Sequence, residues 1–268
     1  MDQRGGAAAR PYLAIDTSTA LGSVAVGRGD RLLAEVVVGV TVRHSEALLP
    51  AVDFVLRSAG LEPRDLGGVV VGGGPGSFTG VRVAGATAKG LVRVLGVPLY
   101  AYSGLLALAV GVGAGLGAPA ASSAAGGCRD DEIGSTPGEF AVGDVVRPTP
   151  PAVCALFDAR RSEVYAGCYR FPGDAIETIL EPTVEPLAQV LDTLRGESPV
   201  FVGDGALRYR AEIEAAGGRV APAFTAVPRG GALLWLADID PARGLVDDPA
   251  SWEPEYLRGA GAERGIAG

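Results

Sequence analysis

The sequence predicts an α/β fold made of two related subdomains, each with the order strand, strand, strand, helix, strand, helix. The first hundred residues open with three short apolar runs and then alternate between helical and strand-like spacing. A weaker copy of this order starts at residue 152, after a stretch rich in Gly, Ala, Ser and Pro at 113–150. With 268 residues, 48% hydrophobic and 20% charged, the chain can bury such cores.

The chain is predicted to open with an antiparallel meander. Three short runs rich in Val and Leu are predicted strands: Tyr12–Asp16, Gly22–Arg28 and Arg31–Val38. The last two runs are joined by Gly29-Asp30, a dipeptide typical of tight hairpin turns.

Helices and strands alternate after the meander. The predicted elements are a helix at His44–Ala59, a strand at Val69–Val71, a helix at Gly80–Leu95 and a strand at Val97–Tyr102. The first helix carries an apolar stripe and ends before Gly60, a residue typical of helix C-termini. Alternation favours parallel pairing of the later strands. This order matches the ribonuclease-H-like subdomain of actin-like folds.

A second, eroded copy is predicted after residue 152. Its elements are a hairpin of Val153–Asp158 and Glu163–Phe171 joined through Ala159-Arg160-Arg161, a strand at Thr178–Val184, a helix at Leu187–Leu194, a strand at Pro199–Val202, and helices at Leu207–Ala216 and Ala232–Ile239. We expect subdomains at 10–107 and 108–268, with a mobile insertion at about 113–150. The last segment is expected to pack back on the first subdomain.

Composition limits the classes of function. A formal charge of −8 is poorly suited to binding nucleic-acid phosphates, because that affinity comes from Lys and Arg.

Cys128, Cys154 and Cys168 form no CxxC motif, so reduced thiols in a cytoplasmic protein are expected. The first ten residues lack the apolar core of a signal peptide and suggest a short disordered extension. Glycines dilute the apolar run at 105–116, which favours a helix that does not enter a membrane.

Three glycine- or hydroxyl-rich turns could bind phosphate. Asp16-Thr17-Ser18 follows the first strand as the Mg²⁺ and phosphate turn of actin-like phosphotransferases does, but a local hydrogen-bonded turn is favoured. The segment Gly72–Gly80 runs from a strand into a helix, where either an anion cradle or a tight loop capped by Ser77 or Thr79 is expected. Gly203-Asp204-Gly205 fits a nucleotide turn or a helix cap at Asp204 equally well.

Two further features concern partners and metals. Gly80, Ala84 and Ala88 recur at helical spacing, which suits packing on the chain's own sheet or a helix–helix subunit interface with the neighbouring helix. His44 is the only histidine, so no pair of histidines can bind a metal.

Several segments together resemble a known family. LAIDTST at 13–19, RHSEALLP at 43–50, VVVGGGPGSFTGVRVAGATAKGL at 69–91, DARRSEVYAG at 158–167 and PEYLR at 254–258 are similar to the TsaB family in wording and order. RHSE together with GPGSFTGxR is specific to TsaB and its catalytic paralogue TsaD, known also as YeaZ and Gcp. TsaD has a histidine pair where this chain has only His44. The insertion at 113–150 departs from the family.

The resemblance implies a non-catalytic dimerisation subunit of the complex that adds threonylcarbamoyl to the adenosine beside the tRNA anticodon. It implies pairing with a TsaD-type subunit, a TsaE-type ATPase in the complex, and contact with tRNA only through that complex. No metal or cofactor is implied, while residual ATP or ADP binding and a homodimer of the isolated chain stay open. The implied partner interface consists of His44, Ser45, Leu48, Val52, Val55, Gly80, Arg82 and Ala84. The implied vestigial nucleotide site consists of Asp16, Thr17, Ser18, Gly76, Ser77, Gly203, Asp204 and Gly205.

A second class of function stays open. An active actin-like kinase or ATPase would use Asp16 and the Gly203–Gly205 turn, although no second carboxylate is obviously placed as a general base, with Asp158 the one candidate.

Overall fold

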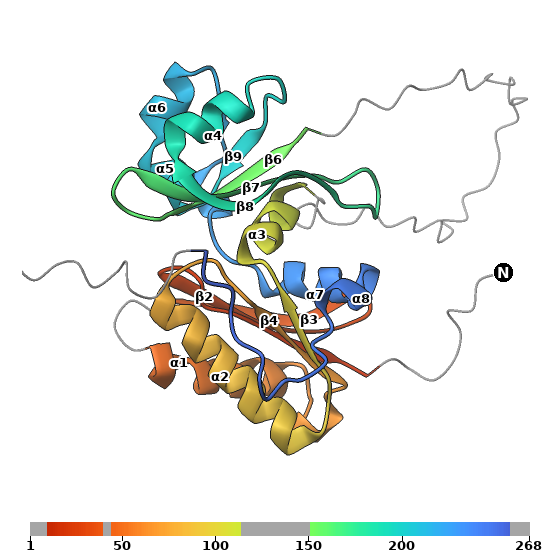
Figure 1. Cartoon of the computed structure of the whole chain (residues 1–268). Helices are drawn as coiled ribbons and strands as arrows, with labels where there is room; N and C mark the ends of the chain where they lie inside the picture. The colour runs from red at the N-terminus through yellow and green to blue at the C-terminus, as the bar shows by residue number, and fades with distance from the viewer. Residues whose placement is uncertain (1–9, 40–43, 114–150, 258–268) are drawn as a thin grey trace, which may run out of the picture.

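The computed structural model describes residues 10–39, 44–113 and 151–257 (Figure 1). The predicted N-terminal extension, Cys128 and nearly all of the predicted insertion lie outside the described residues.

The first sheet has five strands in the order β3-β2-β1-β4-β5. Its strands are β1 Tyr12–Asp16, β2 Leu21–Arg28, β3 Arg31–Gly39, β4 Gly68–Gly72 and β5 Leu99–Tyr102. The first three pair antiparallel, and β4 and β5 continue the sheet in parallel from β1. The predicted meander and the predicted parallel strands are therefore confirmed.

The second sheet repeats this pattern in the order β10-β9-β6-β7-β8. Its strands are β6 Val153–Asp158, β7 Glu163–Arg170, β8 Glu177–Pro186, β9 Val200–Val202 and β10 Arg219–Val220. The strands β6, β7 and β8 form an antiparallel meander, while β9 and β10 add in parallel. The second copy is confirmed, and its fifth strand, only two residues long, escaped the sequence analysis.

Helices lie on the outer faces of both sheets and between them. They are α1 His44–Ser58, α2 Phe78–Leu95, α3 Gly104–Gly113, α4 Leu187–Thr193, α5 Asp204–Arg208, α6 Arg210–Ala215, α7 Gly230–Ile239 and α8 Pro241–Gly244. In Figure 1, α1 and α2 cover the outer face of the first sheet, α4 to α6 the outer face of the second, and α3 and α7 lie between the two sheets. The single helix predicted at Leu207–Ala216 is wrong, because the chain forms two short helices that meet at Tyr209.

The two subdomains exchange helices. The helix α3 follows β5 of the first sheet but packs on β6 and β7 of the second. The helix α7 follows β10 of the second sheet but packs on β1 and β2 of the first, and α3 contacts α7. Residues 105–110 of α3 are all buried, so the exchanged helices form a core shared by both halves.

The chain returns to the first subdomain after α8. Val246 N donates to the Leu99 carbonyl, and Tyr100 bridges to Leu245 beside β5. Residues 248–257, which we call the tail segment, then run along α2, where Lys89 Nζ donates to the Trp252 carbonyl at 2.9 Å. Among the helices that the structure describes, none is both long and apolar enough to span a membrane.

Candidate functional site

The first candidate phosphate turn is closed on itself. Asp16 ends β1 and is 1% exposed. Its Oδ1 accepts hydrogen bonds from the backbone N of Ser18 at 2.8 Å and from Ser18 Oγ at 2.6 Å. Burial raises the pKa of Asp16, and the two Ser18 donors oppose that shift. These residues form the local hydrogen-bonded turn favoured from the sequence.

The glycine-rich loop between β4 and α2 packs directly on this turn. Ser77 N donates to the Ser18 carbonyl at 2.7 Å, and Thr17 Oγ1 donates to the Gly80 carbonyl at 2.6 Å. Ser77 also caps α2 by accepting from Gly80 N. A side chain at Gly80 would collide with the Thr17 carbonyl. The geometry therefore supports a tight loop in which Ser77 caps α2. Gly80 lets the start of α2 approach the backbone of Thr17 closely.

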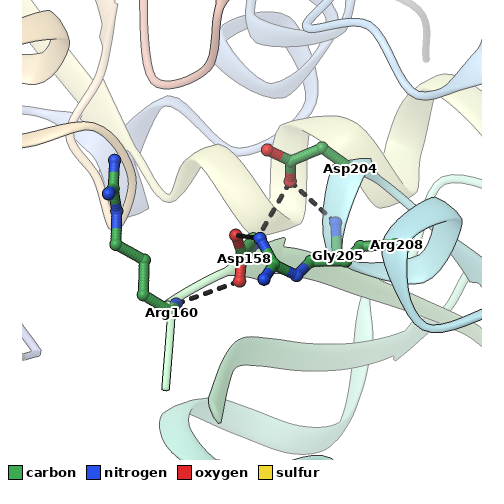
Figure 2. Close-up of polar contacts among 5 residues, drawn as sticks. All are labelled: Asp158, Arg160, Asp204, Gly205 and Arg208. Atoms are coloured by element: carbon green, nitrogen blue, oxygen red, sulfur yellow. Dashed lines mark hydrogen bonds and ion pairs between the residues drawn. The ribbon is translucent and has the colours of Figure 1, made fainter. Parts of the chain in front are cut away.

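A second group of polar residues lies where β6 ends (Figure 2). Asp158 Oδ2 accepts from Arg208 at 2.7 Å, and its Oδ1 accepts from the backbone N of Arg160 at 3.0 Å. Asp204 Oδ1 accepts from the backbone N of Asp158 at 3.2 Å and of Gly205 at 2.8 Å. Each carboxylate thus fixes backbone at the junction of β6 and α5.

The Gly203-Asp204-Gly205 turn is built for close packing on β6. Gly203 has φ of 113°, and a side chain there would collide with the Leu156 carbonyl. The N-cap of α5 is Gly203, so the predicted cap at Asp204 is wrong by one residue. Desolvation by the surrounding protein raises the pKa of the Asp204 carboxyl. The residue as a whole is nevertheless exposed to solvent.

The loop joining β6 to β7 has an unusual backbone. Arg160, Arg161 and Ser162 all have left-handed φ values, 63°, 54° and 63°. For residues with a side chain this conformation costs about 1–2 kcal/mol each. This backbone could not be predicted from the sequence, since the loop lacks the Gly or Asn that such turns usually contain. All three residues are exposed.

The Asp16 turn and the polar residues at the end of β6 both lie near the first residue of α3. A Cβ at Gly104, the first residue of α3, would lie 3.2 Å from Ser18 Oγ and 3.5 Å from Phe157 Cε2. The Asp16 turn and the end of β6 therefore meet at α3. Within the described residues, no cluster of three or more His, Cys, Asp or Glu side chains could bind a metal ion.

The structure corrects the implied partner interface. Leu48, Val52 and Val55 are buried in the core of the first subdomain, and so are Gly80 and Ala84 in α2. Because these five residues are buried, they cannot form an exposed face. Their helical apolar spacing marks the side of each helix that packs on the chain's own sheet. The side chains of His44 and Ser45 lie outside the described residues, although α1 begins at His44.

Arg82 is exposed, but its side chain is bound by the tail segment. Its guanidinium carbon lies 3.8 Å from the Phe78 ring centroid, and its Nε donates to Tyr256 Oη at 3.1 Å. The small-residue stripe is also used internally: Ala88 is in the core, and Gly85 lies against the indole of Trp252.

A different set of apolar and small residues is exposed on the same two helices. Leu49 and Phe54 of α1 are each 57% exposed, and Val94 of α2 is 83% exposed. Ala86 and Gly90 of α2 are exposed too, and a Cβ at Gly90 would meet nothing within 4 Å. We call these five residues the outer α1/α2 face; the sequence analysis missed it because isolated apolar residues on a polar side carry no periodic pattern.

Two sheets of this topology, with an exchanged helix from each half between them, define an α/β protein of the actin-like class. The family model described as TsaD, tRNA N6-adenosine threonylcarbamoyltransferase, matches residues 39–128. The chain is 31% identical over 259 residues to the tRNA threonylcarbamoyladenosine biosynthesis protein TsaB of Bacillus subtilis, covering 94% of this chain and 95% of that protein.

Further comparisons agree. The TsaB protein of Escherichia coli is 29% identical over 199 residues, covering 72% of this chain and 71% of that protein. The solved structure of YeaZ from Pseudomonas aeruginosa has a TM-score of 0.66 and 26% identity, covering 92% of this chain and 99% of that one. The chain belongs to the TsaB family.

Proposed function

We propose that this chain is the non-catalytic partner subunit in tRNA threonylcarbamoyladenosine biosynthesis, and that it pairs with a TsaD-type catalytic paralogue. The biosynthetic role follows from the family, whose members carry it in their names. The observation that carries the pairing role is the outer α1/α2 face, a set of exposed apolar and small residues on two helices that contact each other.

This face suits contact with other helices. Leu49, Phe54 and Val94 offer apolar area, and burying each side chain at an interface contributes about 1–2 kcal/mol before association costs. The open space beside Gly90 lets a partner backbone approach α2 closely. An interface of this kind would also serve a second copy of the chain when no paralogue is present.

The closed Asp16 turn supports the absence of catalysis in this subunit. A phosphate or Mg²⁺ would have to displace the Ser18 hydrogen bonds and the loop around Ser77 that packs on the turn. With His44 as the single histidine of the chain, a metal centre of TsaD type has no counterpart here. We therefore propose a cytoplasmic subunit without a cofactor, joined by a TsaE-type ATPase, that meets tRNA only within the complex.

The test is association with the TsaD-type paralogue, measured by sedimentation with Phe54→Glu. The matched control is Phe224→Glu, because Phe224 is also exposed, at 73%, but lies in the second subdomain. We expect Phe54→Glu to weaken pairing by at least about 10-fold, since a charge enters a dry interface, while Phe224→Glu pairs normally. Both variants should keep the thermal midpoint of the parent chain. If Phe54→Glu pairs at parental affinity, the outer α1/α2 face is not the pairing surface.

Leu48→Glu is unsuitable for this purpose. Leu48 is fully buried in the core, so a charge there would unfold the subdomain and abolish pairing for an unrelated reason.

One observation favours the alternative of an ATP-dependent kinase or ATPase. Asp158 and Asp204 are two carboxylates at the glycine turn 203–205, where Asp204 Oδ1 accepts from the backbone N of Asp158 at 3.2 Å. That alternative requires Mg-ATP binding by the isolated chain and its loss in Asp204→Ala. Calorimetry without heat at millimolar nucleotide would exclude it.

A further inference from the structure

The loop that joins β6 to β7 presents two adjacent exposed arginines. Arg160 and Arg161 are exposed, and in the described part of the chain no Asp or Glu oxygen forms a salt bridge with either guanidinium. The neighbouring Arg208 differs, because its charge is paired with Asp158 at 2.7 Å. Figure 2 shows the Arg160 side chain extending away from Asp158 and Arg208.

The backbone under these arginines is held in place. Asp158 accepts from Arg160 N, the Arg160 carbonyl accepts from Glu163 N at 3.0 Å, and Ala159 N donates to the Glu163 carbonyl at 3.1 Å. The loop is therefore ordered despite three successive left-handed residues. A strained but fixed conformation at an exposed loop is typical of a binding element, since the ordering cost is met before a ligand arrives.

The surrounding charge selects the kind of ligand. The chain as a whole carries a formal charge of −8, so most of its surface repels a polyanion. A polyanion can approach only where exposed arginines are not neutralised by neighbouring carboxylates. Guanidinium groups bind phosphate oxygens in a planar, bidentate manner, and two neighbouring ones match successive phosphates of a nucleic-acid strand.

We propose that the Arg160–Arg161 loop contacts the phosphate backbone of tRNA when the chain is paired with its catalytic partner. This inference rests on the proposed function and adds to it a tRNA contact made by this subunit itself. The family resemblance implied contact with tRNA only through the complex, without naming the residues that make it.

The test uses the reconstituted pair of this chain with its TsaD-type paralogue and measures fluorescence anisotropy of labelled tRNA between about 50 and 200 mM salt. The double substitution Arg160→Ala with Arg161→Ala should weaken binding by about 10-fold at the low-salt end and make the slope of log K against log salt shallower by about 1 to 2. Arg160→Lys with Arg161→Lys should keep the parental slope, because the charges remain. Arg64→Ala with Arg195→Ala is the matched control, since both arginines are exposed and ion-paired and neither lies on α1 or α2.

The outcomes separate the two proposals. Sedimentation of the same samples shows whether the pair forms; a parental chain that does not pair overturns the proposed function and this inference with it. A normal pair that binds tRNA with unchanged affinity and slope after the double alanine substitution overturns the inference alone. Loss of pairing in the double variant also overturns it, because the loop would then contact protein.

Discussion

Anchoring of the tail segment depends on one indole, and removing it should weaken the first subdomain measurably. Trp252 is partly buried against the first core, where a Cβ at Gly85 would lie 3.2 Å from its ring and a Cβ at Gly73 would lie 3.4 Å away. A tryptophan can bury 150–250 Å², roughly, and Trp252→Ala would return about 100 Å² of apolar surface to water, given its partial exposure. At about 25 cal/mol per Å², the loss is about 2.5 kcal/mol.

The full loss appears only if the tail segment stays docked. If it detaches first, the loss of global stability cannot exceed the free energy of detachment. The chain has two tryptophans, so Trp235→Phe leaves Trp252 as the only indole and makes its emission a probe of detachment. Circular dichroism in urea then follows global unfolding separately.

We expect Trp252→Ala to lower the unfolding free energy by about 2 kcal/mol and the midpoint by roughly 4–8 °C. The control Phe224→Ala should change it by less than about 0.5 kcal/mol, because Phe224 is largely exposed. The reasoning is refuted if Trp252→Ala unfolds within about 0.5 kcal/mol of the parent while cleavage of the tail segment by protease is unchanged.

Three further predictions concern the turns at the candidate site. The raised pKa of Asp16 means that its contribution to stability is full below the ordinary value of 3.8 and is lost as pH rises through the folded-state pKa. Asp16→Asn, whose Oδ1 can still accept from Ser18, should therefore gain stability relative to the parent with rising pH, as urea unfolding at several pH values would show; a difference independent of pH contradicts this. Thr17→Val removes the donor to the Gly80 carbonyl at constant shape and should cost about 1 kcal/mol in the same assay, and a neutral result would mean that the bond adds nothing. Arg161→Gly relieves one left-handed residue and should gain about 0.5–1 kcal/mol, because strain of about 1–2 kcal/mol exceeds the entropy cost of glycine in the unfolded chain, about 0.5–1 kcal/mol; a thermal midpoint at or below the parent's contradicts this balance.

The sequence predicted the fold well because apolar periodicity reports burial. The runs that formed β1, β2 and β3 were found within one residue of their observed ends. The strand β10 was missed because two residues cannot show a period. The break at Tyr209 was missed because apolar spacing continues through it, while the backbone there leaves helical geometry with φ of −103° and ψ of 25°.

The same periodicity misdirected the choice of interface residues. Leu48, Val52 and Val55 repeat at helical spacing because they face the sheet, so the strongest pattern in α1 marks its buried side. Partner contacts need the opposite side, where Phe54 stands among polar neighbours. Only the packing of α1 and α2 on the sheet shows that Phe54 and Val94 stay exposed.

The arrangement of the two proposed surfaces makes them compatible in one complex. The outer α1/α2 face lies on the side of the first sheet that points away from the second subdomain (Figure 1). The Arg160–Arg161 loop joins β6 to β7 in the second sheet. A paralogue bound to α1 and α2 would contact the first subdomain, whereas the arginine loop belongs to the second. Because α3 and α7 each pack on the sheet of the other half, the two surfaces are carried by one interlocked core, and pairing on one side would hold the loop at a defined position relative to the partner.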